Sequence, residues 1–312
     1  MACVMTKVED RADPIEAIAH FMAGFSLEAT RPSADDVAAL AGIVPAGASV
    51  YITAVPRRPA REAIETAARL RRAGFEPVPH LAVRGFASAR ELDDFLGRAS
   101  GEAGVTRVLV IAGDHDEPAG DFRSAIEVID GGALQRHGIT GIGIAAYPDG
   151  HPRISQQDLD RSLADKIQSA EATGLAVHVV TQFGFDAQAI LQWIARLREF
   201  GVEHPVRIGL AGPTNLATLL RYAQRCGVRA SAQGLARRAG LLRQLFAMSA
   251  PDALVRTLAQ ARGDNHLGEI APHFFSFGGL LRTARWAAAV AQRRIALEGG
   301  EGFRVEPPPA QG

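Results

Sequence analysis

Short apolar runs alternate with longer amphipathic stretches along most of the chain, and this alternation restricts the fold more than any other property of the sequence. The runs are rich in β-branched residues and are continuously apolar, which is typical of strands buried on both faces. The stretches between them, such as 59–73, carry apolar residues on one stripe and charged residues on the other. Gly74 and Gly201 follow two of them, where a left-handed helix end favours glycine. The eight apolar runs span 25–30, 49–55, 77–83, 107–113, 141–148, 176–183, 206–212 and 273–279.

Eight strands alternating with helices predict a closed parallel (β/α)8 barrel, the TIM barrel, with an open doubly wound sheet as the alternative. The Arg- and Leu-rich segment 231–262 has a helical pattern and no strand of its own, so we expect extra helices between strands seven and eight. A single catalytic domain is predicted over residues 1–300. The Gly- and Pro-rich end of the chain, from Glu298 on, is expected to be loose, with a flexible tail over 301–312.

Composition narrows the class of protein. Hydrophobic residues make up 47% of the chain and charged residues 22%, which fits a packed core rather than disorder. Lys plus Arg equals Asp plus Glu at 34 each, so no basic field for nucleic acid is indicated. No apolar run approaches the roughly 18 residues of a membrane span, and no signal peptide precedes the first helix. We therefore expect a cytoplasmic protein without nucleic-acid or membrane partners.

Two further features bear on environment and assembly. The spacing of Cys3 and Cys226 suggests neither a zinc site nor a disulfide framework, which fits a reducing compartment. The Arg-rich segment 237–243 is interpreted as a solvated helix face, with a homo-oligomer interface as the alternative.

Polar or glycine-rich residues stand where the apolar runs end. Barrel enzymes carry their catalytic groups at the C-terminal ends of the strands, so these residues are expected on one rim. Each also has a structural interpretation: a salt bridge for Glu28, a helix cap for Asp114, a packed loop residue for His80 or His151, a core amide for Gln182 and a lid aromatic for Tyr147. No P-loop is present and no Gly-x-Gly-x-x-Gly follows the first strand, so neither phosphate-binding motif is indicated. No His-x-His or His-Glu-x-x-His pattern is present, so no metal site is predicted. The residues at the run ends include Glu28, Thr53, His80, Gly113, Asp114, Tyr147, His151 and Gln182.

Two motifs are specific as a pair: Tyr147-Pro-Asp-Gly-His-Pro152 and Thr181-Gln-Phe-Gly-Phe-Asp186. Together with four weaker ones in the same order, they resemble the methylenetetrahydrofolate reductase family over roughly residues 20 to 295. The weaker motifs are Phe25-Ser-Leu-Glu28, Pro79-His80-Leu81, Ala112-Gly113-Asp114 and His273-Phe-Phe-Ser-Phe277.

The resemblance implies a flavoprotein that interconverts 5,10-methylenetetrahydrofolate and 5-methyltetrahydrofolate, with FAD as cofactor and NAD(P)H as hydride donor or acceptor. It implies that Glu28 protonates a folate nitrogen to open the methylene bridge and that Asp114, beside flavin and folate, stabilises the cationic intermediate. The substrate-binding residues that it implies are Gln182, which would bond the pterin, Phe183, Phe275 and Phe277. The flavin-lining residues are Thr53, His80, Ala112, Gly113, Asp114, Tyr147, His151 and Lys166.

A general acid at neutral pH needs a raised pKa, and a glutamate among apolar neighbours at a barrel mouth is expected to have one. Three departures from the family pattern weaken the expected cofactor and folate-tail contacts. Ala112 replaces an arginine, Ala29-Thr-Arg-Pro32 replaces an aromatic-Pro-Pro turn, and Gly278-Gly279 replaces a polar pair. The alternatives are a flavin-free reductase that moves hydride directly from NAD(P)H to folate, and a non-catalytic folate- or flavin-binding subunit. Because the chain ends soon after the barrel, no C-terminal regulatory domain is expected.

Overall fold

The structure, a computed structural model, describes residues 13–56, 58–226, 228, 248–262 and 265–307. Eight parallel strands close into a barrel in the order β1-β10-β7-β6-β5-β4-β3-β2, with β1 paired to both β10 and β2. The closed barrel predicted from the sequence is confirmed, and the open sheet is excluded. The barrel strands are β1 (Ser26–Ala29), β2 (Ser49–Ile52), β3 (Glu76–Ala82), β4 (Arg107–Ile111), β5 (Gly141–Ala146), β6 (Ala176–Thr181), β7 (Val206–Ala211) and β10 (Ile270–Phe275).

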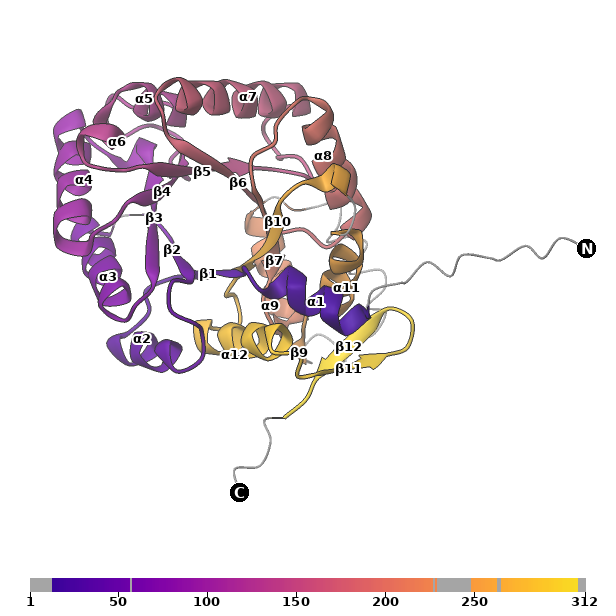
Figure 1. Cartoon of the computed structure of the whole chain (residues 1–312). Helices are drawn as coiled ribbons and strands as arrows, with labels where there is room; N and C mark the ends of the chain where they lie inside the picture. The colour runs from indigo at the N-terminus through magenta and orange to yellow at the C-terminus, as the bar shows by residue number, and fades with distance from the viewer. Residues whose placement is uncertain (1–12, 57, 227, 229–247, 263–264, 308–312) are drawn as a thin grey trace, which may run out of the picture.

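Helices form a ring outside the strands (Figure 1). Short polar side chains cap the N-termini of several helices. Ser33 and Asp36 make a capping box at the start of α2, and Asp186 caps α8. Ser88 likewise caps α4 and accepts from the backbone N–H of Glu91 at 3.3 Å. The described helices are α1 (Pro14–Met22), α2 (Ala34–Ala41), α3 (Ala60–Arg72), η1 (Val83–Gly85), α4 (Ala89–Ala103), α5 (Ala125–Asp130), α6 (Ala133–Arg136), α7 (Gln156–Ala172), α8 (Ala187–Glu199), α9 (Leu216–Arg225), α11 (Asp252–Ala261), η3 (Asn265–Leu267) and α12 (Leu280–Ala291).

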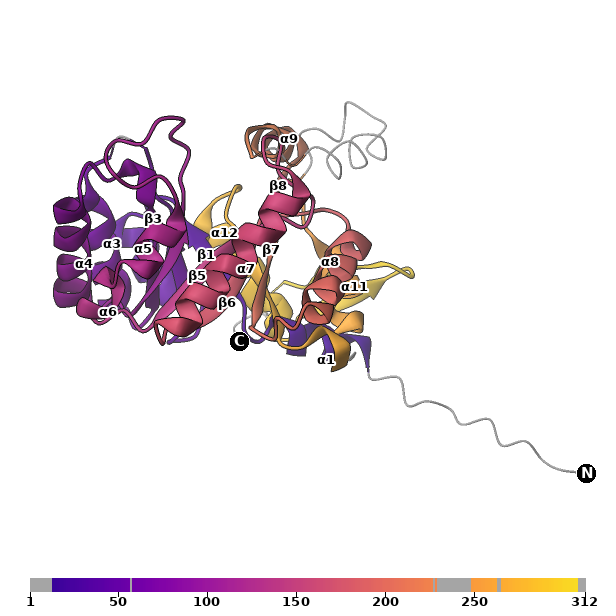
Figure 2. The ribbon, with the colours of Figure 1, turned by 90° about the horizontal axis from the view of Figure 1, so that it is seen from above.

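The two ends of the barrel differ. Helix α1 precedes β1 and lies at the end where the strands begin, whereas α9 follows β7 and stands on the opposite side (Figure 2). The rim at which the strands end therefore carries α9 and the loops after each strand. In the described part of the chain, no helix combines the length and hydrophobicity required to span a bilayer.

The barrel interior contains a polar pair within an otherwise apolar layer. Tyr51 packs with Val78, Leu109 and Val180, and its hydroxyl lies 2.7 Å from Nε2 of His178. Gly143 makes room for this imidazole, since a Cβ at Gly143 would lie 2.9 Å from His178 Nε2. Burial raises the pKa of Tyr51 to about 12 and lowers that of His178 to about 3, so both groups are neutral in the core near pH 7.

The helical segment predicted over 231–262 falls largely outside the described residues. Its described end contains α11 but also β9 (Met248–Ser249), which pairs antiparallel with β8 (Thr214–Asn215) just after β7. The expectation that this segment has no strand was therefore wrong. A two-residue strand is too short to produce a hydrophobic period that a sequence pattern could reveal.

The loose end expected from Glu298 on was also wrong for the residues up to Val305. Strands β11 (Ile295–Glu298) and β12 (Gly302–Val305) form an antiparallel hairpin, and β12 packs against α11 and α12. The ring of Phe303 stacks on Trp286 with centroids 6.0 Å apart, and Arg256 donates to the carbonyl of Gly302 at 2.7 Å. Burial of Phe303, rather than the Gly-rich turn before it, decides that this segment is ordered.

Candidate active site

A cavity of about 990 Å³ opens at the rim where the barrel strands end. It is lined by residues from β1 through β6 and from β10, so it collects the ends of most of the barrel strands. Lys166, Phe183 and Phe277 are the predicted site residues that are not among its lining residues. The predicted residues that line it are Glu28, Thr53, His80, Ala112, Gly113, Asp114, Tyr147, His151, Gln182 and Phe275.

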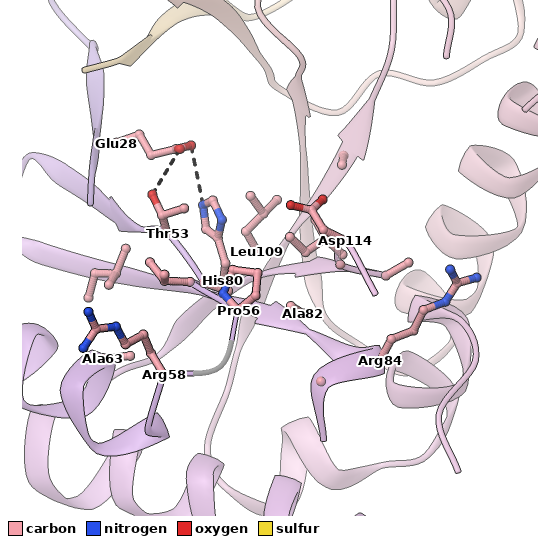
Figure 3. Close-up of a pocket in the computed structure, with 18 of the residues that line it drawn as sticks. Glu28, Thr53, Pro56, Arg58, Ala63, His80, Ala82, Arg84, Leu109 and Asp114 are labelled. Carbon is pink, nitrogen blue, oxygen red and sulfur yellow. Dashed lines mark hydrogen bonds and ion pairs between the residues drawn. The ribbon is translucent and has the colours of Figure 1, made fainter. Parts of the chain in front are cut away.

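Glu28 lies between two imidazoles. Its Oε2 is 3.7 Å from Nε2 of His80, and Thr53 Oγ1 donates to Oε1 at 3.2 Å (Figure 3). On the other side, Oε2 is 3.5 Å from Nε2 of His273. Nδ1 of His273 is hydrogen-bonded to Ser26 Oγ at 2.9 Å, which fixes the ring with Nε2 toward Glu28. Strand pairing explains the arrangement, because Ser26 on β1 lies opposite His273 on β10.

The pKa of Glu28 is lowered, which corrects the raised value expected from the sequence. Burial is the largest single influence and raises the pKa, but the contact with His273, the charges of His80 and His273 and the Thr53 hydrogen bond together outweigh it. Burial also lowers the pKa of His80, while Glu28 opposes that shift. Because the three groups interact closely, a proton entering this site belongs to the Glu28–His80–His273 cluster rather than to one residue.

His273 was missed as a site residue, although the sequence contained a signal for it. Side chains two residues apart on a strand share a face, so His273 lies on the same face as Phe275, which lines the cavity. A histidine inside an apolar run that a closed barrel puts next to the strand of Glu28 is the pattern that could have identified it, and the structure shows it fully buried.

Asp114 approaches the cavity from another strand end. It follows β4, and the next helix, α5, begins only at Ala125, so Asp114 does not cap a helix. The preceding Gly113 has φ +91°, and a Cβ there would lie 2.9 Å from Ala82 Cβ, so the backbone can take this path only at glycine. Figure 3 shows Asp114 and Glu28 extending over the same cavity from different strands.

The negative charge of Asp114 acts on its neighbours across the rim. Burial is the main cause of the raised pKa of Tyr147, and Asp114 adds to it. Burial likewise raises the pKa of Cys226, at the end of α9, to about 11, with Asp114 and Glu28 contributing. Cys226 is therefore the group on which the charges of both carboxylates act.

Gln182 lines the cavity in the turn that follows β6. Its Oε1 accepts from the backbone N–H of Phe183 at 3.1 Å, which aims the amide nitrogen away from the backbone. Thr181 Oγ1 supports the turn by accepting from Gly209 N–H at 2.8 Å and donating to the Gln182 carbonyl at 3.0 Å. Gly209 is required there, because a Cβ would lie 2.4 Å from the Thr181 carbonyl oxygen.

Replacing Thr181 with valine should lower the free energy of unfolding by about 1 kcal/mol, because the buried N–H of Gly209 loses its acceptor while the side-chain volume is kept. Urea unfolding followed by circular dichroism measures the change. A Thr181→Ser variant keeps the hydroxyl and should retain most of the hydrogen-bond contribution. A Thr181→Val protein as stable as the unaltered one would show that the hydroxyl contributes nothing to stability.

The predicted aromatic substrate contacts pack mostly on one another. Phe183 is 1% exposed, and its ring centroid lies 4.9 Å from that of Phe277 and 5.4 Å from that of Phe275. Tyr222 of α9 stacks on Phe277 at 4.1 Å. Of the three predicted phenylalanines, only Phe275 therefore reaches the cavity.

Lys166 lies away from the cavity, on α7. Burial lowers its pKa, against the influence of Asp165. The rim near His151 offers a different cation: Arg153 lines the cavity and pairs with Asp116 at 2.6 Å, joining the loops after β4 and β5.

A model of the family described as methylenetetrahydrofolate reductase matches residues 34–267, three quarters of the chain. The chain belongs to the methylenetetrahydrofolate reductase family. The match includes the segments that carry Thr53, Asp114 and Gln182, whereas Glu28 and His273 lie outside it and reach the same cavity through closure of the barrel.

Two curated relatives carry the same family name. The chain is 28% identical over 140 residues to methylenetetrahydrofolate reductase 2 of Saccharomyces cerevisiae, covering 43% of this chain and 23% of the yeast protein. It is 27% identical over 161 residues to 5,10-methylenetetrahydrofolate reductase of Pectobacterium carotovorum, covering 51% of each chain. The matched regions thus span about a quarter and about half of these relatives.

The fold is shared with a solved structure of a Clostridium thermocellum protein. The two structures align with a TM-score of 0.56 over 88% of this chain and 96% of that chain, at 13% sequence identity. At this level of identity the likeness concerns the barrel fold alone.

Proposed function

We propose that the protein is a flavin-dependent oxidoreductase that interconverts 5,10-methylenetetrahydrofolate and 5-methyltetrahydrofolate, with NAD(P)H as the other substrate. The observation that carries the proposal is the placement of Glu28, with its two histidines, and of Asp114 over one cavity at the barrel rim. The names of the two curated relatives support it. The Clostridium thermocellum protein of the same fold is described as binding two copies of 5-methyl-5,6,7,8-tetrahydrofolic acid, which supports a folate ligand.

The cavity residues fit a flavin dinucleotide. About 990 Å³ lies at the upper end of the roughly 300–1,000 Å³ typical of ligand pockets. Thr53, His80 and Tyr147 would contact the ring system, and the exposed backbone at Gly113 would allow its close approach. Arg84 and Arg153 on the rim would supply cations for phosphates, although Ala112 offers no side-chain contact. When bound, the flavin would carry a hydride between the nicotinamide and the folate.

Opening the methylene bridge requires a proton at N10 of the folate, and the Glu28–His80–His273 cluster would supply it. The C–N10 bond breaks as N10 is protonated, leaving a cationic iminium that Asp114 would stabilise. The folate then gains a hydride at the methylene carbon, so the balance is one proton and one hydride per turnover. The pKa of Glu28 is lowered in the free site, so Glu28 would take up a proton from solvent as folate binds, because the loss of water favours the uncharged carboxylic acid that then protonates N10.

A visible spectrum of the purified protein, before and after 5-methyltetrahydrofolate is added without air, tests the proposal. We expect flavin bands near about 450 nm that bleach when the folate is added. Bands that persist would remove the folate from the proposal. A protein that stays colourless after FAD is supplied would favour the flavin-free reductase, for which Ala112 in place of the family arginine is the motivating observation.

A further inference from the structure

The cavity has an arm that extends away from Glu28 and Asp114, toward the outer helices. The arm reaches between α3 and α4, which pack against each other outside the strands. Figure 3 shows Arg58 on the side of the cavity opposite Arg84. We call it the α3–α4 arm; its lining residues are Arg58, Thr66, Arg69, Phe86, Glu91 and Phe95.

Arg69 lies in this arm with most of its hydrogen-bonding capacity unused. Its Nη2 donates to Thr66 Oγ1 at 3.1 Å, but its buried Nε has no hydrogen-bond partner. Within the described chain, no carboxylate oxygen comes within 4.0 Å of this guanidinium, the limit for an ion pair. A partly buried guanidinium without a carboxylate partner is costly, and Arg69 lines the cavity, so the site favours an anionic group from outside the chain.

The carboxylates near Arg69 are already engaged. Glu62 contacts Arg58 at 3.5 Å and Arg31 at 3.9 Å, and Glu65 pairs with Arg61 at 2.5 Å. Glu91 accepts from the backbone N–H of Ala87 at 2.7 Å. The positive charge of Arg69 is therefore left for a ligand.

Arg256 provides a contrast, because its Nε is also buried without a partner. Its Nη1, however, donates to the carbonyls of Gly299 and Gly302 and secures the C-terminal hairpin, and it does not line the cavity. Only Arg69 combines an unused buried donor with a position in the cavity among the described arginines.

We propose that Arg69 forms a subsite for an anionic group of a ligand whose reactive end lies at Glu28 and Asp114. A phosphate or a carboxylate would accept charge-assisted hydrogen bonds from the Nη groups of Arg69, of which only Nη2 already donates within the described chain, to Thr66 Oγ1. Two sources share this chemistry: the diphosphate of a dinucleotide and the glutamate carboxylates of a folate tail. The identity of these sources rests on the proposed function, whereas the anion subsite rests on Arg69 itself.

Binding to the full chain tests the subsite, with Arg69→Met removing the guanidinium and Arg61→Met as the matched control. Arg61 is on the same helix but is exposed, paired with Glu65 and outside the cavity lining. Binding is measured by titration calorimetry with two kinds of probe. ADP tests the diphosphate, and the difference in affinity between monoglutamyl and pentaglutamyl 5-methyltetrahydrofolate tests the tail. We expect Arg69→Met to weaken one of them about tenfold, as the loss of a charge-assisted hydrogen bond does, and Arg61→Met to leave both unchanged.

Weaker ADP binding would assign the arm to dinucleotide phosphate, and loss of the pentaglutamate advantage would assign it to the folate tail. Unchanged binding of both probes, or no binding of ADP and no pentaglutamate advantage in the unaltered protein, would overturn the subsite. An Arg69→Lys variant separates charge from folding: it should recover part of the affinity while retaining the native circular dichroism spectrum. Arg69-dependent ADP binding in a protein whose flavin does not react with folate would keep the subsite and reject the proposed function.

Discussion

Glu28→Gln is expected to lower the rate of hydride transfer to or from folate by about 10²- to 10⁴-fold, the usual contribution of a positioned general acid. The amide has nearly the same shape and can still accept from Thr53 Oγ1, which donates to Glu28 at 3.2 Å, but it cannot pass a proton to N10. Reduction of the flavin by NAD(P)H needs no proton on folate. Stopped-flow absorbance should therefore show a slowed folate half-reaction and a nearly unchanged nicotinamide half-reaction.

Two further variants test whether the slower folate half-reaction of Glu28→Gln is specific to the site. Glu102→Gln removes a carboxylate that is 51% exposed on α4 and paired with Arg98, and it should leave both half-reactions unchanged. His273→Gln should slow the folate half-reaction as well, because it removes the imidazole that lies 3.5 Å from Glu28. A Glu28→Gln protein with an unaltered folate half-reaction would show that the proton reaches N10 by another route.

The barrel could be predicted because its signal is local and repeated. Each strand is a short apolar run followed by a helix with its own cap and glycine end. Each element is therefore predicted from its own local pattern, and a wrong boundary at one element does not alter the prediction of the next. The hairpin of β11 and β12 was missed because its order depends on Phe303 reaching Trp286, a tertiary contact that a Gly-rich turn conceals. Strand β9 was missed because two paired residues leave no pattern.

Some features of the candidate site could likewise be predicted from the sequence, and others could not. Residues at strand ends, such as Thr53, Asp114 and Gln182, reach the cavity because the topology of a parallel barrel puts every strand end on one rim. The pKa of Glu28 was wrongly predicted because its sign depends on His80 and His273, which come from strands far away in the sequence. Lys166 missed the cavity because the position of a residue along a helix does not determine how far its side chain lies from the rim.

The stability of the protein should fall as the pH decreases below about 6.5, and His178 should account for a large part of the loss. Burial, followed by the charges of Arg207, Arg107 and His273, lowers the pKa of His178 from 6.5 to about 3. Between these values the unfolded chain binds a proton that the folded protein does not, so stability decreases with acidification. Between pH 7 and pH 5 the expected loss from this residue is about 2 kcal/mol. Glu28, whose pKa is also lowered, adds to the loss only at lower pH, below its usual 4.5.

Two variants of the buried pair separate this titration from the hydrogen bond. His178→Gln keeps a partner for the Tyr51 hydroxyl but cannot titrate, so the slope of unfolding free energy against pH should flatten by nearly one proton between pH 6 and pH 5. Tyr51→Phe leaves His178 buried without its partner and should lower stability by about 1 kcal/mol at every pH in this range, with the slope unchanged. Urea unfolding at pH 5, 6 and 7 distinguishes the outcomes. If His178→Gln keeps the full slope, the imidazole is protonated in the folded barrel, and Tyr51 would then have to accept a hydrogen bond from a buried cation.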